Sequence, residues 1–295
     1  MSHVYHRPEL ARDIATQLLR PGVLEQGLRS GLFLFGPRRT GKTTFLLHDL
    51  IPALENAGAL VVYVDLWTDV SADPSTPIHT ALRAALKCLQ STTGDLLSRL
   101  PRHRNPDVAA TRLSFSFETA DLGTPTGATI AQVAKEIVDQ AKTDLVFIVD
   151  EVQHMLTSGA GLALMRAFKA ARDAVNASPN TPGHFIFIGA GSHRAQVVGM
   201  TEGNQSAFLG ATSIEFPALG EDYVQSVLQI LSQEKVKVIP SLLVASQSFA
   251  LVGRRPEELL RALRILQQYQ PPEADHYLPV IAAALKVAAA DIESK

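Results

Sequence analysis

The chain has 295 residues, of which 46% are hydrophobic and 19% charged, and this composition excludes a disordered or low-complexity protein. One cysteine excludes an internal disulfide and a cysteine-based zinc site, and 27 Lys and Arg against 29 Asp and Glu exclude a uniformly basic nucleic-acid binder. No stretch approaches the roughly 18 apolar residues that span a bilayer, and the N-terminus lacks a signal-peptide core. We therefore expect a cytoplasmic protein without a membrane partner.

The N-terminal segment 8–30 has leucine and isoleucine at helical spacing and predicts a helix that packs on the following domain. Short apolar segments then predict strands at 32–35, 60–64, 145–149, 185–188 and 212–216. The first four are continuously apolar, as expected of strands covered on both faces. Segments with helical spacing lie at 44–57, 76–99, 128–141 and 161–176. This alternation predicts an α/β fold with a parallel sheet and right-handed crossovers.

The pattern changes after Pro217, where strand signals stop. Helical segments follow at 220–232, 240–251, 256–269 and 276–291. Pro240 and Pro256 suit the first turns of two of these helices. Residues 101–127 are rich in turn signals and predict an insertion before the third strand. We therefore expect an N-terminal helical extension at 1–30, an α/β core at 31–217 and a small helical domain at 218–295.

The residues after the first predicted strand fit the phosphate-binding pattern G-x-x-x-x-G-K-[ST] at every fixed position. They are Gly36, Pro37, Arg38, Arg39, Thr40, Gly41, Lys42 and Thr43, followed by Thr44. The glycines let backbone N–H groups surround phosphates, and the N-terminus of the next helix favours their negative charge. We expect Lys42 to reach the β- and γ-phosphates of ATP and Thr43 to bind Mg²⁺. The two arginines occupy variable positions of the motif.

The third predicted strand ends in an acidic pair, Asp150 and Glu151. Ligands of open parallel sheets bind at the carboxyl ends of the strands, so this pair should face the phosphate loop. Asp150 would hold Mg²⁺ through water and Glu151 would polarise the attacking water. The alternative is that Asp150 caps a helix starting near Val152. A water-activating glutamate favours hydrolysis over transfer to a small acceptor.

Three stretches, 36–44, 61–67 and 148–153, together resemble the archaeal-type branch of AAA+ ATPases, which is similar to origin-recognition initiators and to signalling STAND ATPases. The resemblance covers about 30–270. It implies a five-stranded parallel sheet in the order 5-1-4-3-2, a helical lid after the sheet, and ATP and Mg²⁺ as cofactors. The motifs are specific for an ATPase fold but not for a biological role.

The resemblance also implies two sensor positions. At the end of the fourth strand, Ser192 matches the position that touches the γ-phosphate or water, with His193 second; a glycine-rich turn without ligand contact is the alternative. In the lid, Pro256 stands where related proteins carry a sensor arginine, so Arg254 and Arg255 are neighbours of that position. Arg255 is our candidate for phosphate contact, against the alternative of solvated arginines before a helix.

Oligomeric AAA+ enzymes place an arginine finger between the fourth and fifth strands. Here the sequence has no Lys or Arg from Ala195 to Glu234, and Arg194 lies early. Losing such a finger lowers turnover by about 10³–10⁵. Hydrolysis is therefore expected to be slow, or to be completed by a second copy or by a partner protein.

These features lead to a principal hypothesis, an ATP-binding and ATP-hydrolysing AAA+ protein that acts as a switch or remodeller. A binding module with a structural, barely hydrolysed ATP is the alternative, and a small-molecule phosphotransferase is a third. ATP or ADP is the expected small ligand. Nucleic acid as a partner depends on one basic cluster, for which a solvated loop is the simpler interpretation. The cluster consists of Arg99, Arg102, His103 and Arg104.

Overall fold

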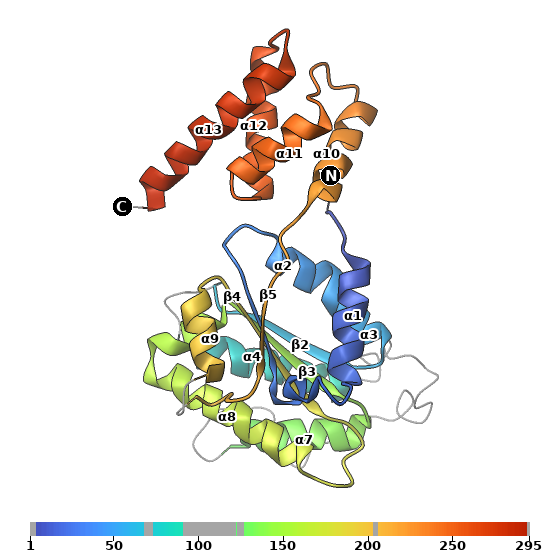
Figure 1. Ribbon diagram of the computed structural model, residues 1–295. Helices are drawn as coiled ribbons and strands as arrows, with labels where there is room; N and C mark the ends of the chain where they lie inside the picture. The colour runs from blue at the N-terminus through green and yellow to red at the C-terminus, as the bar shows by residue number, and fades with distance from the viewer. Residues whose placement is uncertain (1–3, 68–72, 91–121, 123–126, 203–205, 294–295) are drawn as a thin grey trace. The chain divides into compact units, whose positions relative to one another are not determined.

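The structure is a computed structural model that describes residues 4–67, 73–90, 122, 127–202 and 206–293 (Figure 1). The chain divides into two compact units. The larger unit comprises His6–Gly36 and Thr43–Phe216. The smaller unit comprises Pro217–Lys295 together with Pro37–Lys42 and the N-terminal residues up to Tyr5. Most of the predicted insertion, and the basic cluster at 99–104, lie outside the described residues.

The larger unit is built on a five-stranded sheet in the order β2-β3-β4-β1-β5. Its strands are β1 (Leu32–Phe35), β2 (Leu60–Asp65), β3 (Leu145–Asp150), β4 (Phe185–Gly191) and β5 (Thr212–Glu215). All neighbouring strands are parallel, with Leu32 opposite both Ile188 and Thr212. Every residue of β1, β3 and β4 is buried, as their unbroken apolar runs predict. The predicted α/β fold and strand order are confirmed.

Helices cover both faces of this sheet (Figure 1). Successive strand residues point to opposite faces, so Phe33 packs in one apolar cluster and Leu34 in the other. The first cluster includes α4 (Ser75–Gln90), α7 (Ile130–Ala141), α8 (Gly159–Asn176), α9 (Arg194–Glu202) and the 3₁₀ turn η4 (Val152–Thr157). The second includes α1 (Pro8–Leu19), the 3₁₀ turn η1 (Gln26–Ser30), α2 (Lys42–Phe45), the π-helical turn η2 (Leu46–Leu50) and α3 (Ile51–Asn56).

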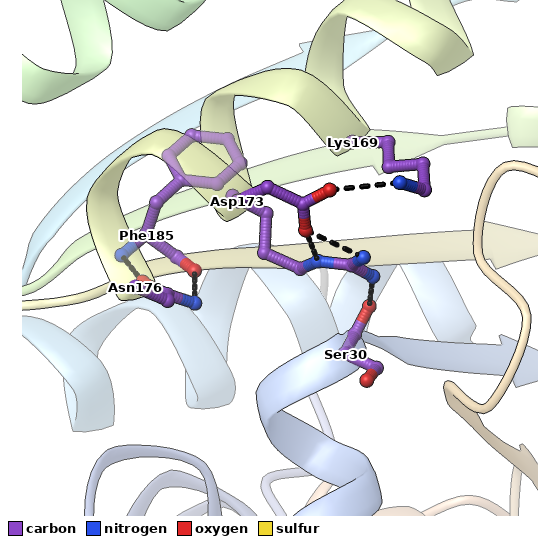
Figure 2. A network of polar contacts seen from close by, with 6 residues as sticks. Ser30, Lys169, Asp173, Asn176 and Phe185 are labelled. Atoms are coloured by element: carbon purple, nitrogen blue, oxygen red, sulfur yellow. Dashed lines mark hydrogen bonds and ion pairs between the residues drawn. The ribbon is translucent and has the colours of Figure 1, made fainter. Parts of the chain in front are cut away.

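A polar network fastens α8 to its neighbours (Figure 2). Arg172 donates one hydrogen bond to the backbone oxygen of Ser30, at 3.0 Å, and two to the carboxylate of Asp173. Burial opposes ionisation of Asp173, but hydrogen bonds from Lys169 and Arg172 outweigh it and lower the pKa of this carboxyl. One turn further, the side chain of Asn176 exchanges two hydrogen bonds with the backbone of Phe185 in β4. The helix carries both its core face and this polar edge.

The smaller unit contains α10 (Glu221–Gln233), α11 (Leu242–Leu251), α12 (Pro256–Tyr269) and α13 (Ala274–Glu293) around an apolar cluster of its own. Tyr5 packs edge-on against Tyr223 and donates a hydrogen bond to Asp222. Burial raises the pKa of Tyr223 to about 12. Pro256 is the first residue of α12, as predicted, but Pro240 precedes the Ser241 cap of α11 and lies outside that helix. Within the described part of the chain, no helix is both long and apolar enough to cross a membrane.

Candidate nucleotide site

The loop between β1 and α2 holds the residues of the phosphate-binding motif. Its backbone takes left-handed conformations at Arg39 (φ 64°) and Gly41 (φ 89°), and glycine adopts this region at low cost. The buried hydroxyl of Thr40 and the ammonium of Lys42 both donate to the backbone oxygen of Pro37, at 2.8 and 2.9 Å. The loop therefore closes on itself through Lys42, which the motif specifies and which begins α2, and through Thr40, which occupies a variable position of the motif.

The threonine of the loop meets the acid of the third strand. Thr43 Oγ1 donates to Asp150 Oδ2 at 2.6 Å, across 107 residues of sequence. Asp150 ends β3, is 1% exposed, and accepts a second hydrogen bond from the backbone N–H of Glu151 at 2.9 Å. It does not cap the following turn, because η4 has no side-chain cap. The structure thus brings the two predicted metal ligands together.

Two further residues of β2, neither of them predicted as a site residue, lie at the Asp150 carboxylate. Tyr63 donates from its hydroxyl to Asp150 Oδ2 at 3.3 Å, and Asp65 stands opposite Asp150 in the parallel register. Burial raises the pKa of Asp150, and the charges of Asp65 and Glu151 add to this, against the hydrogen bonds from Thr43 and the Glu151 backbone. Burial raises the pKa of Tyr63, and the charges of Asp150, Asp65 and Glu151 raise it further. The predicted strand order already placed Asp65 beside Asp150, so this neighbour could have been found from the sequence.

Glu151 has an unusual backbone and a well-defined side-chain environment. Its φ of 52° and ψ of 42° lie in the left-handed region, which costs a residue with a side chain about 1–3 kcal/mol. Ser192, directly after β4, donates to Glu151 Oε2 at 3.1 Å, and the amide of the buried Gln153 donates to the same oxygen. His193 Nδ1 lies 3.1 Å from Ser192 Oγ. The predicted sensor serine and the predicted general base are therefore in direct contact, whereas Gln153 was missed.

The remaining predicted residues divide between the two units. Pro37, Arg38, Arg39 and Thr44 are exposed. Arg39 forms ion pairs of 3.3 and 3.8 Å with Glu257 and Glu258, which belong to the same unit as loop residues 37–42. Arg255 directly precedes α12, and Arg254 donates to the backbone oxygen of Leu219 at 3.2 Å. Arg194, the nearest candidate for a finger, places its guanidinium 5.4 Å from the centre of the Phe35 ring.

No protein-family model and no curated protein matches the chain. Among solved structures, it is similar to a Walker-type ATPase of Pyrococcus abyssi, at 16% identity and a TM-score of 0.55, over 96% of this chain and 75% of that one. It is also similar to the ORC2 protein of Aeropyrum pernix in ADPNP–ADP complexes, at 14% identity and a TM-score of 0.50, over 94% and 67% of the two chains.

The chain shares the fold of this Walker-type ATPase and of this ORC2 protein. The sheet order β2-β3-β4-β1-β5 is the order that the resemblance implied, and the similarity extends over nearly the whole chain. The expected resemblance is therefore confirmed at the level of the fold. Identities of 14 and 16% carry neither activity nor partners across, so the chemistry of this chain has to be argued from its own residues.

Proposed function

We propose that this protein binds ATP with Mg²⁺, hydrolyses it, and acts as a nucleotide-dependent switch or remodeller. The observation that carries the proposal is the 2.6 Å hydrogen bond between Thr43 and Asp150. It joins the metal-binding positions of two independent motifs, and a chance glycine-rich turn would have no reason to place a threonine against a buried strand-end carboxylate. The fold shared with a Walker-type ATPase and with an ORC2 protein in ADPNP–ADP complexes supports the same function.

The oxygen atoms at this position suit Mg²⁺. A hydroxyl and a carboxylate are hard donors, and Mg²⁺ bound with nucleotides takes its other ligands from water and phosphates, so two protein oxygens are enough. Burial and the neighbouring carboxylates raise the pKa of Asp150, and a cation would offset both effects. Thr43 and Asp150 would hold the ion, which supplies charge neutralisation for the β- and γ-phosphates.

The chain's own residues account for the rest of the reaction. Backbone N–H groups of loop 36–43 and the ammonium of Lys42 bind the phosphates. Glu151 accepts a proton from the attacking water. The water oxygen then bonds to the γ-phosphorus of ATP, and the bond between that phosphorus and the β–γ bridging oxygen breaks. Ser192, in contact with Glu151, is assigned the sensor role. Arg255 is assigned a phosphate contact.

We further propose that the chain divides into three functional parts: an extension at 1–30, a core at 31–217 and a helical domain at 218–295. In this scheme the helical domain responds to which nucleotide is bound, and its motion is the output. A second copy or another protein would receive that motion. Nucleic acid is the weaker candidate, because its support is the basic cluster at 99–104 alone.

Nucleotide titrations test the binding step. Calorimetry with ATP and ADP, with and without Mg²⁺, should give saturable binding to the wild-type protein and none to Lys42→Ala. Lys135→Ala is the matched control, because Lys135 lies on the surface of α7 and pairs with Asp139. Absence of ATP binding by the wild-type protein, or equal binding by the Lys42 variant, would contradict the proposal.

A second candidate function is a binding module whose ATP is structural and barely hydrolysed. The position of Arg194 over the Phe35 ring favours it, because the arginine nearest the expected finger position is engaged inside its own unit. Free-phosphate release should separate the two functions when it is measured against protein concentration. Turnover lost in Glu151→Gln with ATP affinity retained supports hydrolysis, whereas bound ATP recovered intact supports the structural role. Phosphate transfer without free phosphate would instead indicate the phosphotransferase.

A further inference from the structure

Gln153 is a buried amide for which the fold alone gives no reason. It lies in η4, two residues after Glu151, and is 4% exposed. Its Nε2 donates to Glu151 Oε2 and, at 3.2 Å, to Ser192 Oγ. Both amide hydrogens are therefore directed at the side chains that carry the proposed water activation.

The hydrogen-bond donors around Glu151 can be assigned one by one. A carboxylate oxygen accepts hydrogen bonds, so Gln153 must turn its amide nitrogen toward Glu151, since the flipped amide would set two oxygens against each other. The Ser192 hydroxyl then donates to Glu151 Oε2 and accepts from Gln153. His193 Nδ1, 3.1 Å away, is left to donate to Ser192. Both described hydrogen bonds to the carboxylate end on Oε2, so Oε1 is left to accept a proton from water.

This arrangement leaves one polar atom without a partner. Among the described residues, Gln153 Oε1 is buried and accepts no hydrogen bond. It faces β4, where a Cβ at Gly191 would come within 2.5 Å of it. A buried amide with an unpaired oxygen is worse for stability than an apolar side chain of similar size. The left-handed backbone of Glu151 is a second local cost at the same turn. Both costs occur where the Glu151 carboxylate is held.

We propose that Gln153 is a positioning residue that, with Ser192, holds Glu151 Oε2 and leaves Oε1 to activate the attacking water. This inference rests on the proposed ATP hydrolysis. It assigns Gln153 no contact with nucleotide. Its effect passes entirely through Glu151, and this separates it from a residue that only packs between η4 and β4.

Steady-state turnover and ATP affinity of Gln153→Leu test the inference. The substitution keeps the volume and removes both donors. We expect kcat to fall about 10- to 100-fold, as for hydrogen bonds to a charged group, with the Kd for ATP within about twofold. Gln196→Leu is the matched control, because Gln196 is exposed on the neighbouring helix α9 and should leave both constants unchanged. Gln153→Met serves as the second variant if the leucine substitution impairs folding.

A double-mutant comparison separates positioning from packing. Adding Gln153→Leu to Glu151→Gln should not lower the residual turnover further, because the group that it positions is already gone. A second, full-sized loss in that background would overturn the inference, as would wild-type kcat in Gln153→Leu. If wild-type protein releases no phosphate, the proposed hydrolysis fails and takes the inference with it. A wild-type protein that turns over beside an unaffected Gln153 variant refutes the inference alone.

Discussion

Gly161 and Gly159 both lie in the first turn of α8, yet replacing them with alanine should have opposite effects. A Cβ on Gly161 would lie 2.1 Å from the backbone oxygen of Met155 and 2.7 Å from its carbonyl carbon. Both are backbone atoms of η4, so no side chain can rotate away from the contact. A Cβ on Gly159 would meet nothing within 4 Å. The pair isolates the approach of η4 to α8 from the helix propensity that the two substitutions share.

The magnitudes follow from these contacts. Alanine in place of glycine stabilises a helix by about 0.5–1 kcal/mol, so Gly159→Ala should raise the free energy of unfolding by up to that amount. Overpacking costs about 1–3 kcal/mol, and a contact with backbone belongs at the upper end. Gly161→Ala should therefore lower the free energy of unfolding by about 1–2 kcal/mol after the propensity gain. The two variants should differ by about 2–3 kcal/mol.

Urea denaturation followed by tryptophan fluorescence measures this difference. Trp67 is the single tryptophan of the chain and lies in the larger unit, so its signal reports on the unit that contains α8. Midpoints of the two variants should move in opposite directions at equal slopes. Equal stabilities would refute the close approach of Gly161 to η4. Because η4 also carries Gln153, Gly161→Ala should lower turnover below that of Gly159→Ala.

Three other perturbations have expected outcomes. Asp150→Asn should raise the melting temperature near pH 7 without Mg²⁺. Burial raises the pKa of Asp150, so the protonated carboxyl stabilises the fold at low pH and this stabilisation is lost as pH rises through the folded-state pKa. The advantage of the neutral Asn side chain should therefore vanish in melts at acid pH. Thr43→Val should weaken ATP binding in Mg²⁺ but not without it, and Thr43→Ser should retain affinity, both by calorimetry. Arg172→Met should cost about 1 kcal/mol in urea denaturation, mostly through the Ser30 hydrogen bond, since exposed Asp173 is screened by solvent.

The sheet could be predicted because its signals are local. Unbroken apolar runs at 145–149 and 185–188 identify strands covered on both faces, and the structure extends them to Asp150 and Gly191. The helix after the phosphate loop was predicted as one regular segment at 44–57. In the structure it widens into the π-helical turn η2, where buried Asp49 binds the His6 side chain and the Arg7 backbone. That partnership joins residues more than forty positions apart, and periodicity carries no trace of it.

The residues of the candidate site also divide into those that local sequence signals predict and those that depend on the folded backbone. Motif spacing and strand order sufficed for Thr43 and Asp150, because both lie at the carboxyl edge of the sheet. Gln153 could not be found in this way. The direction of the Gln153 side chain depends on the left-handed backbone conformation of Glu151. The sequence does not indicate that conformation, because it predicts an ordinary helix start near Val152. Whether Gln153 contacts the Glu151 carboxylate thus depends on the backbone conformation of Glu151.

Local rules of stability are broken together at the carboxyl ends of β2 and β3. Asp65 and Asp150 stand opposite each other with Glu151 next in sequence, and their charges add to burial in raising the pKa of Asp150. Natural folds retain such conflicts mainly at functional sites. A bound cation would offset the repulsion between these carboxylates. Phosphates bound to a divalent cation would also pair with the positive charge of Lys42 in the phosphate loop. The electrostatics of β2 and β3 therefore favour a metal–nucleotide ligand independently of the motif, because the same carboxylates would repel a nucleotide that arrived without its metal.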